Sequence, residues 1–280
     1  MDQPTTGVPT VVWMANRDAP INGKYLKFIL FEDGNLALTD AEQYIIWSTH
    51  TKSTSSISLQ LQLHDTYNLI LFEREQSLWQ SFDYPIDTLL PDQPLTTNRQ
   101  LVSSRSSTSY ASCFYKLFFD DYDSILRLHY EDPVSTRVFW HDPRFLHWEV
   151  GRYQYVYNRR ASLNSDGEFK SSDGLEIFSF DYGIGPQRMM KIEIDGNLRV
   201  YGFIEHQTRK EWKVQWQVVS RSYRVHGICG PNSLCTYSHD AGRRCIYLHG
   251  YKMVNSEDVD LIPLVLMGKI KNRFFNLEEN

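Results

Sequence analysis

Asp33-Gly34-Asn35-Leu36-Ala37-Leu38 predicts a turn followed by an alternating strand, and Ile46-Trp47 follows, with Trp47 12 residues after Asn35. The same pattern returns at Asp65-Thr66-Tyr67-Asn68-Leu69-Ile70-Leu71, where Trp79 of Leu78-Trp79 lies 11 residues after Asn68. Val12-Trp13 precedes both, so the three tryptophans are spaced by 34 and 32 residues. Self-similarity at a fixed period indicates repeated units that share one core. We therefore expect Trp13, Trp47 and Trp79 to be core residues.

The composition favours a soluble β protein over a nucleic-acid or membrane protein. The 280 residues are 41% hydrophobic and 14% aromatic, so a core can be buried, and the net charge of -5 gives no basic surface for phosphate. The longest uncharged apolar stretch, residues 261–268, is far shorter than the ~20 residues of a membrane span. Residues 1–9 are polar and lack the apolar centre of a signal peptide. We expect neither nucleic-acid binding nor membrane insertion by this chain.

Short alternating segments separated by turn residues predict an all-β sandwich, barrel or prism. Residues 11–20 are expected to run from a strand into a turn. Before the serine-rich stretch 96–112, the other expected strands are Phe28–Leu30, Leu36–Leu38, Tyr44–Ser48, Ser58–Leu63, Leu69–Phe72 and Leu78–Phe82. After it, they are Tyr115–Phe119, Ile125–Tyr130, Arg137–Trp140, Arg188–Ile194 and Leu198–Tyr201, followed by Trp212 and Trp216.

Several motifs resemble the plant bulb-type lectin domain, and specifically the ectodomain of S-domain (G-type lectin) receptor-like serine/threonine kinases. They are Val12-Trp13-Met14-Ala15-Asn16-Arg17-Asp18, Asp33-Gly34-Asn35-Leu36, Ile46-Trp47-Ser48-Thr49, and Trp79-Gln80-Ser81-Phe82-Asp83-Tyr84-Pro85 with Asp87-Thr88-Leu89-Leu90-Pro91. The resemblance covers roughly residues 11 to 254. It implies an all-β fold of two tandem bulb-lectin-like β-prisms, each with three sheets around a pseudo-threefold axis, followed by a degenerate EGF-like module.

The resemblance also implies the domain limits. We expect a bulb-type lectin domain at 1–97, a linker at 98–112, a second lectin-like (S-locus glycoprotein) domain at 113–225, a degenerate EGF-like module at 226–254 and a divergent tail at 255–280. Family members have further strands before the one that holds Trp13. We therefore expect the first prism to lack part of one sheet and to be destabilised by its open edge.

The mannose pocket of the family has the pattern Gln-x-Asp-x-Asn-x-Val-x-Tyr, which this chain keeps only in part. Around Asn35 the Gln and Tyr are lost, and before Asn68 the acid has moved one residue away, to Asp65. The third copy has Glu for Gln and Arg for Val. The candidate sugar-binding residues are Asp33, Asn35, Asp65, Asn68, Asp195, Asn197 and Tyr201. The alternative is that the Asp and Asn residues only form turns.

The cysteines near the C-terminus resemble those of the EGF-like module that follows in these ectodomains. There the first cysteine pairs with the third and the second with the fourth, whose place is held here by Tyr247. The resemblance thus implies a disulfide between Cys229 and Cys245 and leaves Cys235 unpaired; it gives Cys113 no partner. A zinc site from these residues with His239 and His249 is the alternative, but the spacing fits poorly, and we expect no metal.

No kinase, serine-hydrolase or zinc-protease motif is found in this sequence. We therefore expect no catalysis and no cofactor. The resemblance implies a recognition ectodomain that binds a protein, peptide or glycan ligand, with receptor homo- or heterodimers as further partners. Its family biology is pollen self-recognition and defence signalling at the extracellular side of the plasma membrane, or in secreted form. The alternatives are a mannose-binding lectin and a non-functional truncated product.

Overall fold

The structure is a computed structural model that describes residues 10–19, 25–54, 59–132, 135–142, 144–154, 157–206, 209–220, 225–229, 233–238 and 242–248. Its regular structure is almost entirely β, as predicted. The helical structure of these residues is limited to the short 3-10 turns η2 (Ser81–Asp83) and η3 (His147–Val150). No helix of the described part is long and apolar enough to cross a bilayer.

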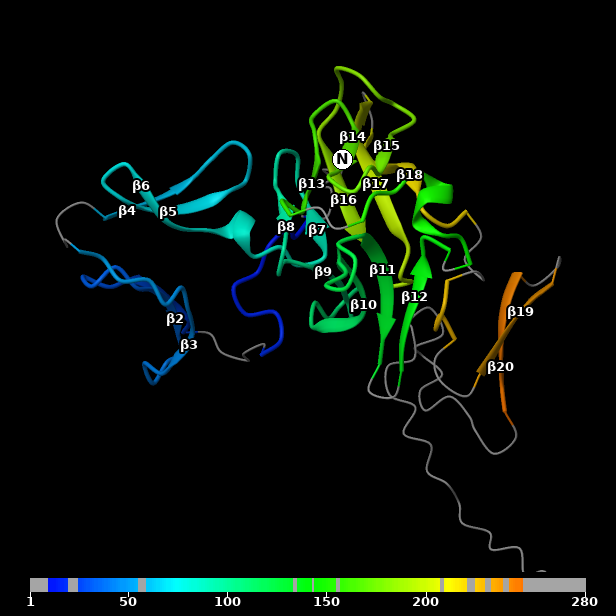
Figure 1. Cartoon of the computed structure of the whole chain (residues 1–280). Coiled ribbons are helices and arrows are strands. Elements are labelled where there is room, and N and C mark those ends of the chain that lie inside the picture. Colours follow the sequence, from blue (N-terminus) through cyan, green and yellow to red (C-terminus); the bar gives the residue numbers. More distant parts are fainter. Residues whose placement is uncertain are drawn as a thin grey trace, which may run out of the picture.

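The first strands form two three-stranded antiparallel sheets, which together with residues 10–19 make up what we call the N-terminal group (Figure 1, blue and cyan). The sheets are β1 (Lys27–Leu30), β2 (Leu36–Thr39) and β3 (Ile45–Ser48), then β4 (Leu59–Leu63), β5 (Leu69–Glu73) and β6 (Gln76–Gln80). The turn between β1 and β2 contains Gly34 at φ +85°, a conformation that glycine adopts without strain. The predicted hairpin around this turn is confirmed.

The three repeated tryptophans meet in the core of the N-terminal group. The ring centroids of Trp13 and Trp47 are 5.8 Å apart, those of Trp13 and Trp79 are 5.5 Å apart, and those of Trp47 and Trp79 are 5.8 Å apart. All three pairs are edge to face, the arrangement that the ring quadrupoles favour. Leu36 and Leu71, both buried, pack in the same cluster. One tryptophan comes from each sheet and the third from the segment 10–19, so the repeat in the sequence corresponds to a shared core.

The segment 10–19 contains the predicted turn, but the strand expected before that turn is absent from its described residues. Residues 10–14 lie outside the described strands, and residues 15–19 form a turn and bends. Its polar side chains bind elsewhere: Arg17 donates hydrogen bonds to the carbonyl oxygens of Val102 (3.0 Å) and Tyr110 (2.8 Å). Asp18 accepts one from the backbone N–H of Ser112 at 2.6 Å. The segment thus places Trp13 in the core of the N-terminal group, whereas Arg17 binds residues 102 and 110 much later in the chain.

Three four-stranded antiparallel sheets form the central group (Figure 1, green to yellow). Their orders are β12-β11-β10-β9, β15-β14-β13-β8 and β18-β17-β16-β7. The strands are β7 (Thr88–Leu89), β8 (Leu95–Thr96), β9 (Leu101–Ser104), β10 (Ser112–Phe119), β11 (Leu126–Glu131), β12 (Thr136–Trp140), β13 (Arg160–Leu163), β14 (Glu168–Ser171), β15 (Glu176–Phe178), β16 (Arg188–Ile192), β17 (Leu198–His206) and β18 (Arg209–Gln217). All three sheets contribute side chains to one hydrophobic cluster.

The segment 98–112, expected to be a linker, instead contains β9, which pairs with β10. Leu101 and Ser103 are 0% exposed. The serines suggested a solvent-exposed linker, but buried hydroxyls are compatible with a strand when they form hydrogen bonds. Ser104 Oγ, for example, donates to Asp87 Oδ2 at 2.7 Å. Upstream of this segment, β7 and β8 also join the central sheets. The expected boundary at residue 97 therefore falls inside the central group of sheets.

A two-stranded hairpin, β19 (Ser233–Ser238) and β20 (Gly242–Tyr247), follows the central group. The structure contains the disulfide between Cys229 and Cys245 that the resemblance implied. Cys229 is buried in the central core, so the disulfide ties the hairpin to that core. Cys235 and Cys113 are free thiols. The expected tail 255–280, and His239 and His249 of the zinc alternative, lie outside the described residues.

Candidate functional site

The asparagines of the sugar-binding pattern are turned into the protein. Asn68 is 6% exposed and its Nδ2 donates to Gln80 Oε1 at 2.9 Å. Its Oδ1 accepts hydrogen bonds from Ser81 Oγ and from the backbone N–H of Phe82, both at 3.2 Å. The side chain of Asn68 therefore fastens the start of β5 to the end of β6.

Asn197 makes the equivalent connection in the central group. It is 1% exposed, and its Nδ2 donates to the carbonyl oxygen of Val219 at 2.7 Å, while its Oδ1 accepts from the N–H of the same residue at 3.0 Å. Asn35, which is half-buried, accepts a hydrogen bond from Thr49 Oγ1 at 3.3 Å. The amides of Asn68 and Asn197 are thus buried and engaged within the protein, whereas Asn35 is half-buried.

The acidic and aromatic members of the pattern are also engaged locally. Asp33 and Asp195 each accept the N–H two residues ahead, of Asn35 and Asn197, at 3.0 Å, which is an Asx turn. Asp195 is also held by both terminal nitrogens of Arg199, at 3.0 and 2.6 Å. Tyr201 Oη donates to Glu193 Oε1 at 2.7 Å, and burial raises the pKa of Tyr201. Glu193 and Arg199, which replace the family's Gln and Val, therefore satisfy this cluster from within.

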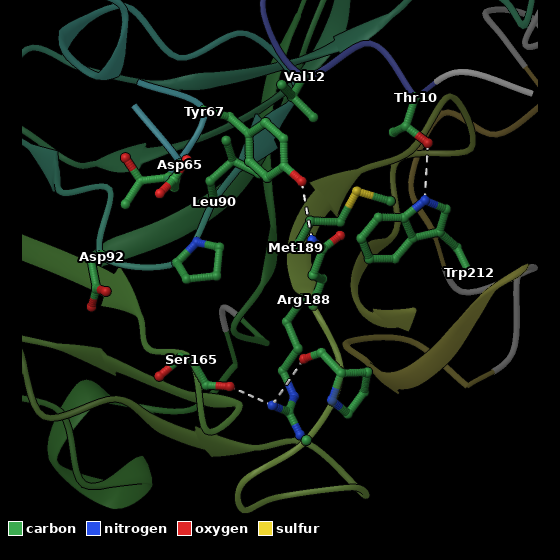
Figure 2. Close-up of a pocket in the computed structure, with 15 residues that line it drawn as sticks. Thr10, Val12, Asp65, Tyr67, Leu90, Asp92, Ser165, Arg188, Met189 and Trp212 are labelled. Atoms are coloured by element: carbon green, nitrogen blue, oxygen red, sulfur yellow. Dashed lines mark hydrogen bonds between the residues drawn. The ribbon is translucent and has the colours of Figure 1, made fainter. Parts of the chain in front are cut away.

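Asp65 differs from these residues, because it lines a pocket between the two sheet groups (Figure 2). The cavity has a volume of about 460 Å³. From the N-terminal group it is lined by Thr10, Val12, Asp65, Thr66 and Tyr67. From the central group it is lined by Leu90, Pro91, Asp92, Ser165, residues 185–189 and Trp212. We call this cavity the junction pocket.

Apolar side chains from both groups meet beside the junction pocket. Leu90 and Met189 are buried in one small cluster with Phe82, and Val12 and Trp212 pack against it. Apolar burial of this kind stabilises the contact between the groups at roughly 25 cal/mol per Å². The pocket therefore has an apolar wall that neither group supplies alone.

Two hydrogen bonds cross the pocket from one group to the other. Trp212 Nε1 donates to Thr10 Oγ1 at 2.9 Å, and Gln187 Nε2 donates to Tyr67 Oη at 3.1 Å (Figure 2). Each of these hydrogen bonds joins two residues that are more than 100 positions apart in the sequence. Sequence reasoning missed these pocket residues because no local pattern connects them.

Tyr67 has a left-handed backbone, with φ at +65°. Glycines occupy this conformation in the turns before β2 and β17, at Gly34 (+85°) and Gly196 (+78°). A non-glycine residue costs ~1 kcal/mol or more there. The ring is half exposed and lines the pocket. The signal available in the sequence was the replacement of Gly by Tyr67 directly before Asn68.

The exposed charged residues that line the pocket are acidic. Arg188 is the basic lining residue, and its side chain is 0% exposed. Its guanidinium donates to the carbonyl oxygens of Ser165 and Asp181, the latter at 2.6 Å. Asp65 and Asp92 are exposed at the pocket, and neither forms an ion pair with any residue that the structure describes. Two exposed acidic residues therefore line the cavity without an ion-pair partner in the described part of the chain.

Comparison with known proteins agrees with the sequence motifs. The family model described as D-mannose binding lectin (B_lectin) matches residues 10–111. The putative receptor protein kinase ZmPK1 of Zea mays is 34% identical over 232 residues, 82% of this chain and 28% of that protein. The G-type lectin S-receptor-like serine/threonine-protein kinase At2g19130 of Arabidopsis thaliana is 26% identical over 274 residues, 90% of this chain and 31% of that protein.

A solved structure, Japanese Marasmius oreades lectin, aligns with a TM-score of 0.32 and 17% identity over 51% of this chain and 99% of that one. The chain spans about a third of the length of the curated relatives it matches. The chain therefore contains a lectin domain of the B_lectin family and is related to the plant G-type lectin S-receptor-like serine/threonine kinases.

Proposed function

We propose that this chain is a non-catalytic recognition module of the S-receptor type, placed on the extracellular side, and that it binds its ligand in the junction pocket. The observation that carries the proposal is the position of Tyr67. Tyr67 lines a cavity of about 460 Å³ and has a left-handed backbone. The equivalent position of the first repeat is occupied by Gly34. Backbone strain of this kind persists at ligand-binding sites, and the cavity has the size of a small-ligand pocket.

The proposal also rests on what the sugar-binding pattern does in this chain. Asn68 and Asn197 are buried and their amides bind within the sheets. The junction pocket, by contrast, has an exposed ring, two exposed carboxylates and an apolar wall. Because the chain is related to the S-receptor kinases, we propose that its ligand is a protein, a peptide or a glycan. We also propose that it consists of two tandem β-prisms followed by a remnant of an EGF-like module.

The test is a screen of glycan and peptide libraries with the whole chain and with Tyr67→Gly. Glycine removes the ring and its hydrogen bond to Gln187, which is destabilising, and relieves the left-handed backbone, which is stabilising. We therefore expect the variant to lose the ligands with only a small change in melting temperature. Tyr122→Ala is the control, because Tyr122 is 81% exposed and is not a lining residue of the pocket. Ligands that bind Tyr67→Gly as well as the parent chain would overturn the proposal.

The second candidate is a mannose-binding lectin, which the B_lectin match favours. In that case methyl α-mannoside would bind the chain, Asp195→Ala would remove the binding, and Tyr67→Gly would leave it unchanged. The third reading, a non-functional product, predicts a broad thermal transition and a weak near-ultraviolet circular dichroism signal. A cooperative transition with a strong aromatic signal would contradict it.

A further inference from the structure

We infer that the junction pocket recognises a cationic group, namely the ammonium or guanidinium group of a Lys or Arg side chain in a peptide ligand. This inference rests on the proposed function and names the chemistry of the ligand. It is carried by three features of the same cavity: the two acidic residues that line it, the half-exposed ring of Tyr67, and the engagement of Arg188 in hydrogen bonds to the main chain.

The charges favour a cation. Asp65 from the N-terminal group and Asp92 from the central group line the cavity, and no described residue neutralises either carboxylate by an ion pair. A ligand that fills the cavity removes water from these carboxylates. A neutral or acidic ligand would leave them without compensation, which is unfavourable, whereas a basic group supplies the missing charge.

Arg188 does not provide that charge. Its guanidinium is fully buried beneath the pocket and donates to main-chain carbonyl oxygens, including that of Asp181 at 2.6 Å. Its Nε lies 3.5 Å from Asp181 Oδ1. The donors of Arg188 therefore hold the loop before β16 in place, so they do not offer a binding site for an anion or compensate Asp65 and Asp92.

The aromatic residues present the surfaces that bind cations. The indole N–H of Trp212 is bound to Thr10, and the hydroxyl oxygen of Tyr67 accepts a hydrogen bond from Gln187. Figure 2 shows the Tyr67 ring and the Trp212 indole on either side of Met189. The Trp212 ring also packs against Phe203, with centroids 5.1 Å apart, whereas the Tyr67 ring is half exposed. The face of Tyr67 therefore remains for a ligand. A Lys or Arg side chain has an aliphatic stem for the apolar wall and a charge that is attracted to ring faces and carboxylates.

The experiment titrates the whole chain with N-acetyl-Gly-Lys-Gly-amide, the corresponding Arg and Glu peptides, butylammonium and methyl α-mannoside, by isothermal calorimetry at low and high salt. We expect the Lys and Arg peptides to bind, high salt to weaken them, and the Glu peptide not to bind. The double variant Asp65→Asn/Asp92→Asn should weaken them by about tenfold. Glu75→Gln, an exposed acid that is not a lining residue, should have no effect.

Different outcomes separate this inference from the proposed function. If an uncharged or acidic probe binds in a manner that depends on Tyr67 and the basic peptides do not, the cationic assignment is wrong and the pocket remains the site. Equal binding of butylammonium and the Lys peptide would overturn the assignment to a peptide. If Asp65→Asn/Asp92→Asn binds the basic peptides as tightly as the parent chain does, the two carboxylates do not contribute to binding and the cationic assignment is wrong. If no probe and no library ligand depends on Tyr67, both proposals fail.

Discussion

The side-chain amide of Gln187 donates a 3.1 Å hydrogen bond to the hydroxyl of Tyr67, 120 residues earlier in the chain. Tyr67 belongs to the N-terminal group and Gln187 lies directly before β16 of the central group. The junction pocket is formed between them, so it exists only while the two groups keep their mutual arrangement. Interactions that fix this arrangement should therefore affect both stability and binding.

Arg17 is one of these interactions. It donates hydrogen bonds to the carbonyl oxygens of Val102 (3.0 Å), Ser103 (3.2 Å) and Tyr110 (2.8 Å). Hydrogen bonds from a charged donor contribute about 1.5–3 kcal/mol, and we expect Arg17→Met to lower the free energy of unfolding by about 2–3 kcal/mol in urea denaturation. Arg144→Met is the control, since Arg144 is exposed and, among the residues that the structure describes, its side chain binds only Asp142. Equal effects of the two substitutions would contradict the account.

Asn197 is expected to act on stability, with no direct part in sugar binding. Its amide exchanges two hydrogen bonds with the backbone of Val219, at 2.7 and 3.0 Å. Asn197→Ala removes the partners of these partly buried backbone groups, so the free energy of unfolding should fall by about 1–3 kcal/mol. The exposed Asn158→Ala should leave it unchanged. An Asn197→Ala variant with normal stability that lost mannoside binding would restore the lectin reading of this site.

His129 makes the stability depend on pH. Its ring is 5% exposed and stacks on Phe118, with centroids 4.4 Å apart. Burial lowers the pKa of His129 below its usual 6.5. The unfolded chain therefore takes up a proton near pH 6.5, and the folded chain does so only at lower pH. Stability is complete above pH 6.5 and falls as the pH decreases toward the folded pKa.

His129→Leu should reduce the loss of melting temperature between pH 7.5 and 5.5. It should not remove the loss entirely, because burial also lowers the pKa of His141 and of His226. The control is His64→Gln at an exposed position. If His129→Leu and the parent chain lost the same number of degrees, His129 would not be a source of the pH dependence.

The two free thiols should differ in reactivity. Cys113 is 6% exposed and burial raises the pKa of its thiol, which lowers the fraction of reactive thiolate at pH 8. Cys235 is half-buried, and Cys229 and Cys245 are joined. A thiol reagent should modify one cysteine rapidly in the folded chain and a second only after unfolding. Cys235→Ser should remove the fast reaction; two fast thiols in the parent chain would be inconsistent with this structure.

Much of the N-terminal group could be predicted because its signals are local. The turn Asp33-Gly34 and the alternating residues of β2 lie close together in sequence, and each tryptophan repeats at a similar spacing. The packing of Trp13, Trp47 and Trp79 follows from that repeat. The conformation of the segment 10–19 was harder to predict, because Arg17 and Asp18 bind residues more than 80 positions away.

The rest depends on contacts that a single sequence does not display. β7 has only two residues, which is too short to give a pattern. β9 lies in a serine-rich stretch that resembles a loop, although Ser104 is hydrogen-bonded inside the protein. The pattern around Asn68 and Asn197 suggested sugar ligands, whereas their side chains face inward. The junction pocket joins Tyr67 to Gln187 and Trp212, and such long-range pairs appear only when both sheet groups are folded.

The most direct test of the junction pocket uses the indole N–H signal of Trp212 in a nitrogen–proton correlation spectrum. The chain has seven tryptophans, and Trp212→Phe identifies the signal. During titration with N-acetyl-Gly-Lys-Gly-amide, the account predicts a saturable shift of the Trp212 signal, steady signals from Trp13, Trp47 and Trp79, and loss of the shift in Tyr67→Gly. A Trp212 signal that stays in place while a library ligand or the Lys peptide saturates the chain would contradict it.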